Sequence, residues 1–462
     1  MMKQLLTLSL VVFLCSSAAA QENNVSTNIR IDSLIKKWME DTHTPGLALG
    51  ILQRGHQAKV KTYGIADVEN SVPVTDESVF MVASLSKQFI SFAILLLEQE
   101  KRLSLEDPAV KYITELPEPL NKITIYQLLN HTSGLVRDPE NYHPYDRQGV
   151  MEVIKSMYTV PLVAQPGDKW LYSNAGYFIL AEIITRVSGN AWDTFITNKL
   201  FIPAGMSKTR TGTFSEIIPG RVAGYNYTKQ GLINTERWIA VRPSGAFVST
   251  ITDMVKWDNF LDTTHILSPE RKDLLCKPTK LNNGTPLHYA LGWYAEPFLG
   301  TPRIHHDGQY PGFRSDYERF PAEGLTLIIL SNLDNRPLES LAIKAAGILT
   351  PKLTLPPFKI RVTVPEKVVV GDQKIPIDIT ITDEGKDIVN SLVEMEIWDE
   401  SGKSVYKQNA EGLNFNATEP KQLHFSWSPQ KAGRYTVNIG IYGPRWAFSY
   451  AWLTNLVTIK VQ

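Results

Sequence analysis

The hydrophobic pattern of this chain changes at the proline pair Pro356-Pro357, and that change constrains the fold more than any other feature. Beyond it, apolar and polar residues alternate in short segments that turn residues separate, as in Ile375–Ile381 and Tyr435–Ile441. Alternation with a period of two places one face of a β-strand in a core. Such segments recurring over residues 357–462 predict an immunoglobulin-like β-sandwich. The segments are Lys359–Val364, Ile375–Ile381, Val393–Trp398, Leu423–Trp427, Tyr435–Tyr442 and Leu456–Val461.

The region before the proline pair is expected to form a domain of its own, because 462 residues exceed one ordinary domain. Apolar residues at helical spacing predict a first helix over residues 25–45, and two strands are predicted at Gly46–Gln53 and 57–63. Helical segments and loops follow without regular alternation of strand and helix. This pattern predicts a mixed α/β (α+β) domain over residues 25–352, with helices around an antiparallel sheet. The alternative, that residues 357–462 extend this domain, fits ordinary domain sizes less well.

Residues 1–20 have the three parts of a secretory signal peptide: a positive start, an apolar run and small residues before the cleavage point. Cys15 is also compatible with a lipoprotein anchor. A lipid-attachment cysteine normally follows a small residue, however, and Leu14 precedes it here. We therefore expect a secreted or periplasmic protein.

The remaining composition excludes several classes of protein. Without the signal peptide, Cys276 would be the only cysteine, so no internal disulfide is expected, and a lone cysteine is usually a small core residue. No later segment reaches about 18 consecutive apolar residues, so no transmembrane span is expected. Lys plus Arg and Asp plus Glu both number 47, and a zero formal charge disfavours a nucleic-acid-binding protein.

Ser84 and Lys87 open an apolar helical stretch and share one helix face, one turn apart. The lysine amine can take the hydroxyl proton, which a serine must lose before it attacks a carbonyl. The start of a helix also offers unpaired backbone N–H groups to such a nucleophile. The pattern alone is weak, because Ser-x-x-Lys recurs at Ser33, Ser404 and Ser428, and serine is also an ordinary helix cap.

Two further motifs follow Ser84 along the chain. Tyr172-Ser173-Asn174 lies in a turn that leads into a helical segment, and His306-Asp307-Gly308 precedes a predicted strand. The ordered motifs Ser-x-x-Lys, Tyr-x-Asn and His-x-Gly resemble those of the penicillin-recognising serine hydrolases, specifically the class C β-lactamase-like family. That family contains β-lactamases, DD-peptidases, D-aminopeptidases and β-lactamase-like esterases. The resemblance covers roughly residues 30–350. Stretches that support it are Leu128–Leu135, Pro243–Ala246 and Ile328–Asn332.

The resemblance implies the β-lactamase/transpeptidase-like fold and a set of roles that the side-chain chemistry fits. Ser84 would form an acyl-enzyme, and Lys87 would act as the base if burial lowered its pKa. Tyr172 would relay the proton, because a phenol both donates and accepts. Asn174 would bind a substrate amide or Lys87. No cofactor is implied.

The third motif would contribute to substrate binding. Gly308 lets the backbone approach the substrate closely, because it has no Cβ. The backbone N–H groups of Ser84 and Gln309 are candidate donors to the oxyanion. β-Lactamases usually carry a lysine where this chain has His306, which would be largely neutral near pH 7. A weaker anchor for a substrate carboxylate favours the esterase and D-peptidase branches of the family over an efficient β-lactamase.

Simpler interpretations exist for several of these residues. Tyr172 could be a packed aromatic residue at a helix entry, and Asn174 a helix cap. The pair His305-His306 suggests a metal, but neighbouring strand residues point to opposite faces and no carboxylates at ligand spacing surround the pair. No metal site is therefore expected.

The predicted function is that of a secreted serine hydrolase acting on a small-molecule or peptide acyl substrate, an ester or an amide. A β-lactamase or DD-carboxypeptidase is the first alternative, and a non-catalytic penicillin- or glycan-binding protein is the second. Near the C-terminus the even-numbered residues of a predicted strand are aromatic: Trp446, Phe448, Tyr450 and Trp452. Such a face could bind a glycan or mediate self-association, but filling a core is the commoner use of aromatic residues.

Overall fold

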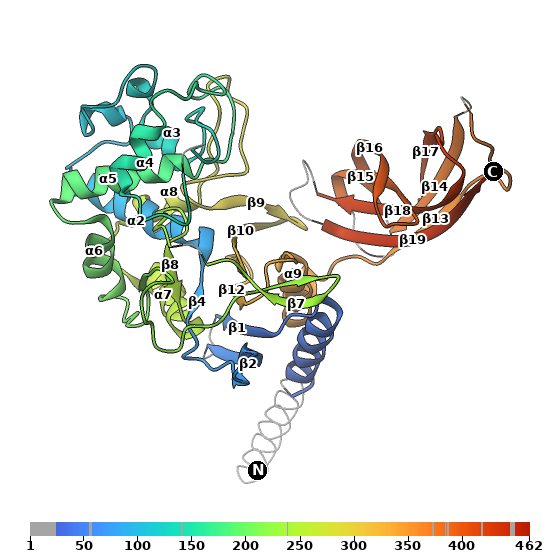
Figure 1. Cartoon of the computed structure of the whole chain (residues 1–462), viewed down its shortest axis with the longest axis horizontal. Coiled ribbons are helices and arrows are strands. Elements are labelled where there is room, and N and C mark those ends of the chain that lie inside the picture. The colour runs from blue at the N-terminus through green and yellow to red at the C-terminus, as the bar shows by residue number, and fades with distance from the viewer. Residues whose placement is uncertain are drawn as a thin grey trace, which may run out of the picture. The chain divides into compact units, whose positions relative to one another are not determined.

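The computed structural model of the chain describes residues 25–54, 58–139, 142–237, 239–371, 374–383, 385, 388–416, 419–443 and 449–462 (Figure 1). The predicted signal peptide lies outside these residues. The chain divides into two compact units, one ending at Ala346 and one formed by Gly347–Gln462. The domain limits 25–352 and 357–462 stay predictions.

The first unit is built on a seven-stranded antiparallel sheet with the strand order β3-β2-β1-β12-β11-β10-β9. Strand β1 lies beside β12, with Leu47 opposite Ser331, so the two ends of this unit meet in the sheet centre. The prediction of a mixed α/β fold is confirmed. The strands are β1 (Gly46–Gln53), β2 (Lys59–Asp67), β3 (Val72–Pro73), β9 (Tyr294–Phe298), β10 (Thr301–Tyr310), β11 (Phe313–Phe320) and β12 (Leu325–Ser331). Short strands outside this sheet are β4 (Phe80–Met81), β5 (Arg210–Thr211), β6 (Tyr225–Thr228), β7 (Gly231–Asn234) and β8 (Phe247–Ser249).

The end of the first helix and the end of strand β2 differ from the predicted positions. The first helix covers residues 25–42 rather than 25–45, because Pro45 disfavours helical backbone in the residue before it. Strand β2 continues to Asp67 beyond the predicted end at 63, because its last residues pair with β3, where Ile65 lies opposite Pro73.

Helix α2 (Ser86–Gln99) is the centre of the unit, since every residue from Ser86 to Leu97 is buried. A helix that is buried all round needs neighbours on each side. It packs against α5, α6 and α8, while α7 lies on β1 and β12 (Figure 1). The other helices are α3 (Ile125–Leu129), α4 (Val150–Ser156), α5 (Ala175–Ser188), α6 (Trp192–Ile196), α7 (Ile251–Thr263), α8 (Pro269–Cys276) and α9 (Glu339–Leu349). Single turns are η1 (Ala83–Leu85), η2 (Ala109–Lys111), η3 (Leu120–Lys122), η4 (Thr197–Phe201) and η5 (Pro351–Leu353).

The second unit consists of two β-sheets, β13-β14-β17 and β16-β15-β18-β19. The isoleucines of β14 and the apolar residues Val437, Ile439 and Ile441 of β18 are buried, as the period-two pattern predicted. An additional β domain is thus confirmed, and its immunoglobulin-like type stays a prediction. Its strands are β13 (Phe358–Thr363), β14 (Ile375–Asp383), β15 (Ile388–Asp399), β16 (Ser404–Phe415), β17 (Lys421–Trp427), β18 (Gly433–Tyr442) and β19 (Ser449–Val461).

The predicted aromatic face of this unit is not continuous. Trp446 and Phe448 lie outside the described residues. Tyr450 is 9% exposed and its ring contacts Phe358, whereas Trp452 is 37% exposed. The two differ because a register shift between Ile441 and Tyr442 interrupts the alternation along β19. Among all described residues, no helix has the length and apolarity needed to cross a membrane.

Candidate active site

Ser84 lies in the single turn η1, between strand β4 and helix α2. Ala83 before it has a φ of 48°, so the backbone turns sharply at this point. The Lys87 Nζ atom, in the first turn of α2, is 2.9 Å from Ser84 Oγ. The pairing predicted from the Ser-x-x-Lys spacing is therefore present.

Lys87 is fully buried, and its amine contacts neutral groups. Nζ lies 3.0 Å from Asn174 Oδ1 and 3.0 Å from the Ser244 carbonyl oxygen. Among the residues that the structure describes, no carboxylate is within ion-pair distance of it. Burial lowers the pKa of the Lys87 amine well below its usual value, and the nearby Arg242 guanidinium lowers it further. Both effects favour the neutral amine, which is the form that can accept a proton.

Tyr172 completes the group around Ser84. Its ring centroid is 4.7 Å from Lys87 Nζ, and Ser84 is among the groups that influence the pKa of its phenol. Burial raises the pKa of Tyr172 well above its usual value, so the phenol stays protonated. Tyr172 is thus more than a packing residue in this geometry.

Asn174 stands at the start of α5 but makes no side-chain capping hydrogen bond. Its Oδ1 atom accepts from Lys87, and its Nδ2 atom donates to Asp138 Oδ1 over 3.0 Å. The interpretation of Asn174 as an ordinary helix cap is therefore wrong. Ser173 takes that role, since its Oγ atom accepts from the Gly176 N–H over 3.2 Å.

The third motif lies on β10, where alternate residues face opposite sides of the sheet. His306 is buried, and its Nε2 atom is 3.1 Å from the Tyr289 hydroxyl. Burial lowers the pKa of His306 to about 4, so the ring is neutral at pH 7, as expected from its ordinary pKa. Asp307 and Gln309 line the cavity at Ser84, while His306 lies behind it.

Gly308 is required by a close approach within the protein itself. A Cβ atom there would lie 2.2 Å from Ser315 Oγ and 2.7 Å from the Val82 carbonyl oxygen. The missing side chain therefore lets β10 pack directly against the residues that lead into Ser84. That Gly308 also lets the backbone approach a substrate closely stays a prediction.

The cavity at Ser84 has a volume of about 570 Å³. The sequence motifs predicted four of the residues that line this cavity: Ser84, Tyr172, Asn174 and Gln309. They did not predict the charged wall of the cavity, which is formed by Arg137, Asp138 and Arg242. These three belong to loops, and no periodicity or spacing in the sequence connects position 137 with position 242. The full lining is Ser84, Arg137, Asp138, Trp170, Tyr172, Asn174, Arg242, Ser244, Gly245, Tyr294, Asp307, Gln309, Tyr310, Pro311 and Asp334.

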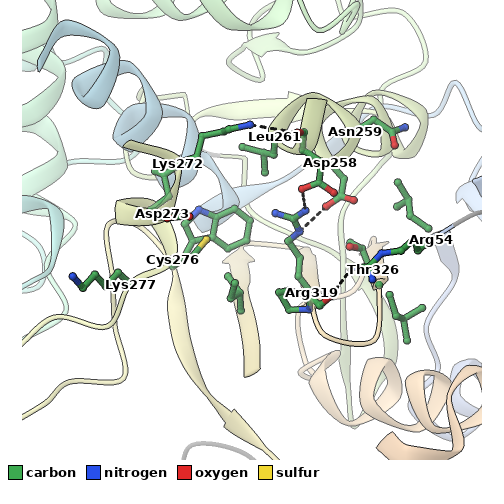
Figure 2. A pocket seen from close by; sticks show the side chains of 18 of the residues that line it. Arg54, Asp258, Asn259, Leu261, Lys272, Asp273, Cys276, Lys277, Arg319 and Thr326 are labelled. Atoms are coloured by element: carbon green, nitrogen blue, oxygen red, sulfur yellow. Dashed lines mark hydrogen bonds and ion pairs between the residues drawn. The ribbon is translucent and has the colours of Figure 1, made fainter. Parts of the chain in front are cut away.

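A larger cavity of about 1340 Å³ lies elsewhere, between α7, α8 and the large sheet (Figure 2). Its principal cation, Arg319, pairs with Asp258 over 3.0 Å and also with Asp262. Burial raises the pKa of the Cys276 thiol to about 11, so this cysteine stays protonated. The cavity therefore lacks an activated nucleophile among its described lining residues.

One group of possible metal ligands occurs in the described part of the chain, formed by His305, Glu318 and Glu339. The Arg303 guanidinium already contacts both carboxylates, Glu318 over 2.6 Å and Glu339 over 2.7 Å. A cationic side chain therefore occupies the position that a metal ion would take, and these residues do not fit a metal site.

Comparison with known proteins gives matches over the same region. A profile of the beta-lactamase family matches residues 31–349. Penicillin-binding protein 4* of Bacillus subtilis is 29% identical over 311 residues, which cover 62% of this chain and 68% of that protein. The D-amino acid amidase of Ochrobactrum anthropi SV3, solved with D-phenylalanine, is 24% identical with a TM-score of 0.60, over 67% of this chain and 92% of that one. The octameric penicillin-binding protein homologue of Pyrococcus abyssi is 19% identical with a TM-score of 0.63, over 90% of this chain and 98% of that one.

Proposed function

The chain belongs to the beta-lactamase family and is a serine hydrolase of that fold, and on this premise we propose that it cleaves an ester or amide bond through an acyl-enzyme on Ser84. One observation carries the proposal: the buried Lys87 amine lies 2.9 Å from Ser84 Oγ with no carboxylate to hold it charged among the described residues. A lysine in this state is a base, and a serine beside it is a nucleophile.

The side chains support a complete reaction cycle. Lys87 takes the proton of Ser84 as Oγ attacks the substrate carbonyl carbon, and the N–H groups of Ser84 and Gln309 are the proposed donors to the oxyanion. Tyr172 delivers a proton to the leaving alcohol or amine as the bond to it breaks. Lys87 then passes the Ser84 proton on to Tyr172, so that both groups are neutral again. For deacylation, one of them takes a proton from the water that attacks the acyl carbon. A proton returns to Ser84 Oγ as its bond to the acyl carbon breaks and the acid leaves. Asn174 positions the Lys87 amine.

The preferred substrate is a neutral ester or amide, because His306 offers no positive charge to a carboxylate. A second candidate, hydrolysis of carboxylate-bearing D-peptides or β-lactams, is favoured by the charged wall of the cavity. Arg137 and Arg242 are opposed by three lining aspartates, Asp138, Asp307 and Asp334, so this candidate depends on Arg137, whose side chain is 68% exposed to an incoming ligand. This wall supplies an anion anchor that the sequence motifs do not contain.

Secretion or a periplasmic location, directed by residues 1–20, remains part of the proposal. Self-association or glycan binding through the second unit also remains a proposal. The octameric state of the Pyrococcus abyssi homologue, which resembles this chain over both units, supports self-association. The alternative of a non-catalytic penicillin-binding protein makes a separable prediction, since its adduct with a fluorescent penicillin would form and never clear.

The test is a comparison of kcat/KM for p-nitrophenyl acetate, a D-Ala-D-Ala peptide and nitrocefin, each with the natural protein and with Arg137→Gln. We expect the ester to be turned over faster than nitrocefin. We also expect Arg137→Gln to lower kcat/KM about threefold for the two anionic substrates and to spare the ester, as for a partly exposed charge pair. Faster turnover of nitrocefin than of the ester would overturn the preferred substrate. Absence of turnover for all three substrates would overturn the proposal that the protein is a hydrolase acting through Ser84.

A further inference from the structure

Behind the cavity, three buried side chains form a continuous series of hydrogen bonds. The Ser173 N–H donates to His131 Nδ1 over 3.1 Å, and His131 Nε2 is 3.1 Å from the Tyr289 hydroxyl. That hydroxyl is also 3.1 Å from His306 Nε2, and His306 Nδ1 is 2.6 Å from the Asp307 carbonyl oxygen. His131, Tyr289 and His306 are each at most 1% exposed.

The two ends of this series fix the direction of every bond in it. A backbone N–H can only donate, so His131 Nδ1 carries no proton and a neutral His131 carries it on Nε2. A backbone carbonyl can only accept, so the proton of a neutral His306 is on Nδ1 and its Nε2 atom is an acceptor. Tyr289 then accepts from His131 and donates to His306. Each nitrogen and hydroxyl in the series has a partner of the complementary kind.

We propose that His131, Tyr289 and His306 form a one-directional hydrogen-bond chain that holds the two histidines in opposite neutral tautomers and positions Tyr172 for proton transfer. These are positioning residues, because none of the three lines the cavity among its described lining residues. The effect on catalysis rests on the proposed function, whereas the assignment of the two histidine tautomers is independent of it.

The hydrogen-bond chain can act on Tyr172 because the His131 ring packs against the Tyr172 ring. The His131 ring centroid lies 4.3 Å from that of Tyr172, and the two rings are inclined by 38°. Both nitrogens of His131 are held, one by the backbone of Ser173 and the other by Tyr289, so the ring cannot rotate without breaking a buried bond. The chain thereby joins the turn of the second motif to the strand of the third motif.

The charges around the chain favour two neutral rings. Arg137 is a cation that faces His131, Asp307 is an anion that faces His306, and Lys87, when protonated, adds a positive charge near both rings. The tyrosine rings that pack on the two histidines are uncharged: Tyr172, Tyr177, Tyr289 and Tyr294. Burial lowers the pKa of both histidines. Protonating His131 would also place its Nδ1–H against the Ser173 N–H, and protonating His306 would require the Tyr289 hydroxyl to rotate away from it.

The test is ¹⁵N NMR of the natural, full-length protein labelled at histidine, recorded between pH 5.5 and 8. We expect one buried histidine with its proton on Nε2, a second with its proton on Nδ1, and no titration of either in this range. Assignment uses His131→Gln and His306→Gln. Titration of either ring, or the same tautomer in both, would overturn the proposal.

Tyr289→Phe keeps the ring but removes the hydroxyl, and Tyr317→Phe is the matched control. Tyr317 is equally buried, and its hydroxyl donates a hydrogen bond to Asp258, which is not part of the His131–Tyr289–His306 series. We expect Tyr289→Phe to lower kcat about tenfold to a hundredfold with little change in KM, as for a displaced catalytic group, and to let His306 titrate. A loss of kcat no larger than that of Tyr317→Phe would overturn the positioning role. Absence of turnover in the natural protein would count against the proposed function. The histidine tautomers measured by NMR would still decide whether the hydrogen-bond chain is present.

Discussion

At the scale of single residues, the site depends on a lysine that is buried without a charge partner. Lys87 contacts a hydroxyl, an amide oxygen and a backbone carbonyl oxygen, all of which can accept but carry no charge. Removing an ammonium group from water without a counter-charge disfavours its protonated form. Tyr172 shifts in the opposite direction, because burial disfavours the phenolate. Burial therefore favours an uncharged amine and an uncharged phenol in this pair.

The pH dependence of activity follows from these two shifts. The lowered pKa of Lys87 means that kcat/KM should rise with pH as the amine loses its proton and reach a plateau well below pH 10.5. The raised pKa of Tyr172 means that no fall should follow below about pH 10, the ordinary pKa of a phenol. The measurement is kcat/KM for p-nitrophenyl acetate from pH 5 to 10. A rise that continues to pH 10 would show that Lys87 keeps an ordinary pKa and is not the base.

Sequence motifs were sufficient to predict the residues that meet at Ser84, but not those that surround them. Ser84 in the η1 turn and Lys87 in the first turn of α2 are three residues apart, so their spacing alone predicted their contact. Arg137 and Arg242 reach the cavity only because two loops fold over it, and nothing local to either residue encodes that approach. The sequence indicates His131 only as part of the family-like stretch Leu128–Leu135, since the ring's partners, Ser173 and Tyr289, lie far along the chain.

At the scale of secondary-structure elements, the decisive contact is between β10 and the η1 turn that carries Ser84. Gly308 faces the Val82 carbonyl oxygen and the Ala83 side chain, with no space for a Cβ atom. The position of the nucleophile is thus set by the backbone of a neighbouring strand as well as by its own helix. The period-two pattern could place a strand here. It could not show which segment the strand would touch.

Substituting Gly308 tests this contact. We expect Gly308→Ala to destabilise the protein by about 1–3 kcal/mol through overpacking, and to lower kcat because relief of the clash displaces Ser84. The measurements are thermal unfolding and esterase kinetics. Gly149→Ala is the control, since nothing lies within 4 Å of a Cβ atom at that position. Equal behaviour of the two variants would show that the close approach does not hold the nucleophile in place.

At the scale of the whole molecule, the chain consists of two compact units, and the residues named in the proposed reaction belong to the first. The Pro356-Pro357 pair and the change in hydrophobic pattern were enough to predict a second, all-β region. The irregular register of β19 was not predictable, because a one-residue bulge leaves no mark on composition.

A truncation after Pro356 tests whether the first unit is self-sufficient. It retains α9 and the fully buried Leu353, and we expect it to fold and to keep most of its activity on p-nitrophenyl acetate. Circular dichroism and esterase kinetics provide the measurement. Aggregation, or a folded but inactive product, would show that the second unit contributes to the core or to the site.

The central claim is that Ser84 is the nucleophile, and covalent labelling tests it most directly. The protein is incubated with a fluorophosphonate, its intact mass is measured, and the modified peptide is sequenced. We predict one adduct per chain, located on Ser84, and none on a folded Ser84→Ala variant. Ser33→Ala, Ser404→Ala and Ser428→Ala, which alter the other Ser-x-x-Lys matches, should label like the natural protein. An adduct on another residue, or undiminished labelling of Ser84→Ala, would contradict the account.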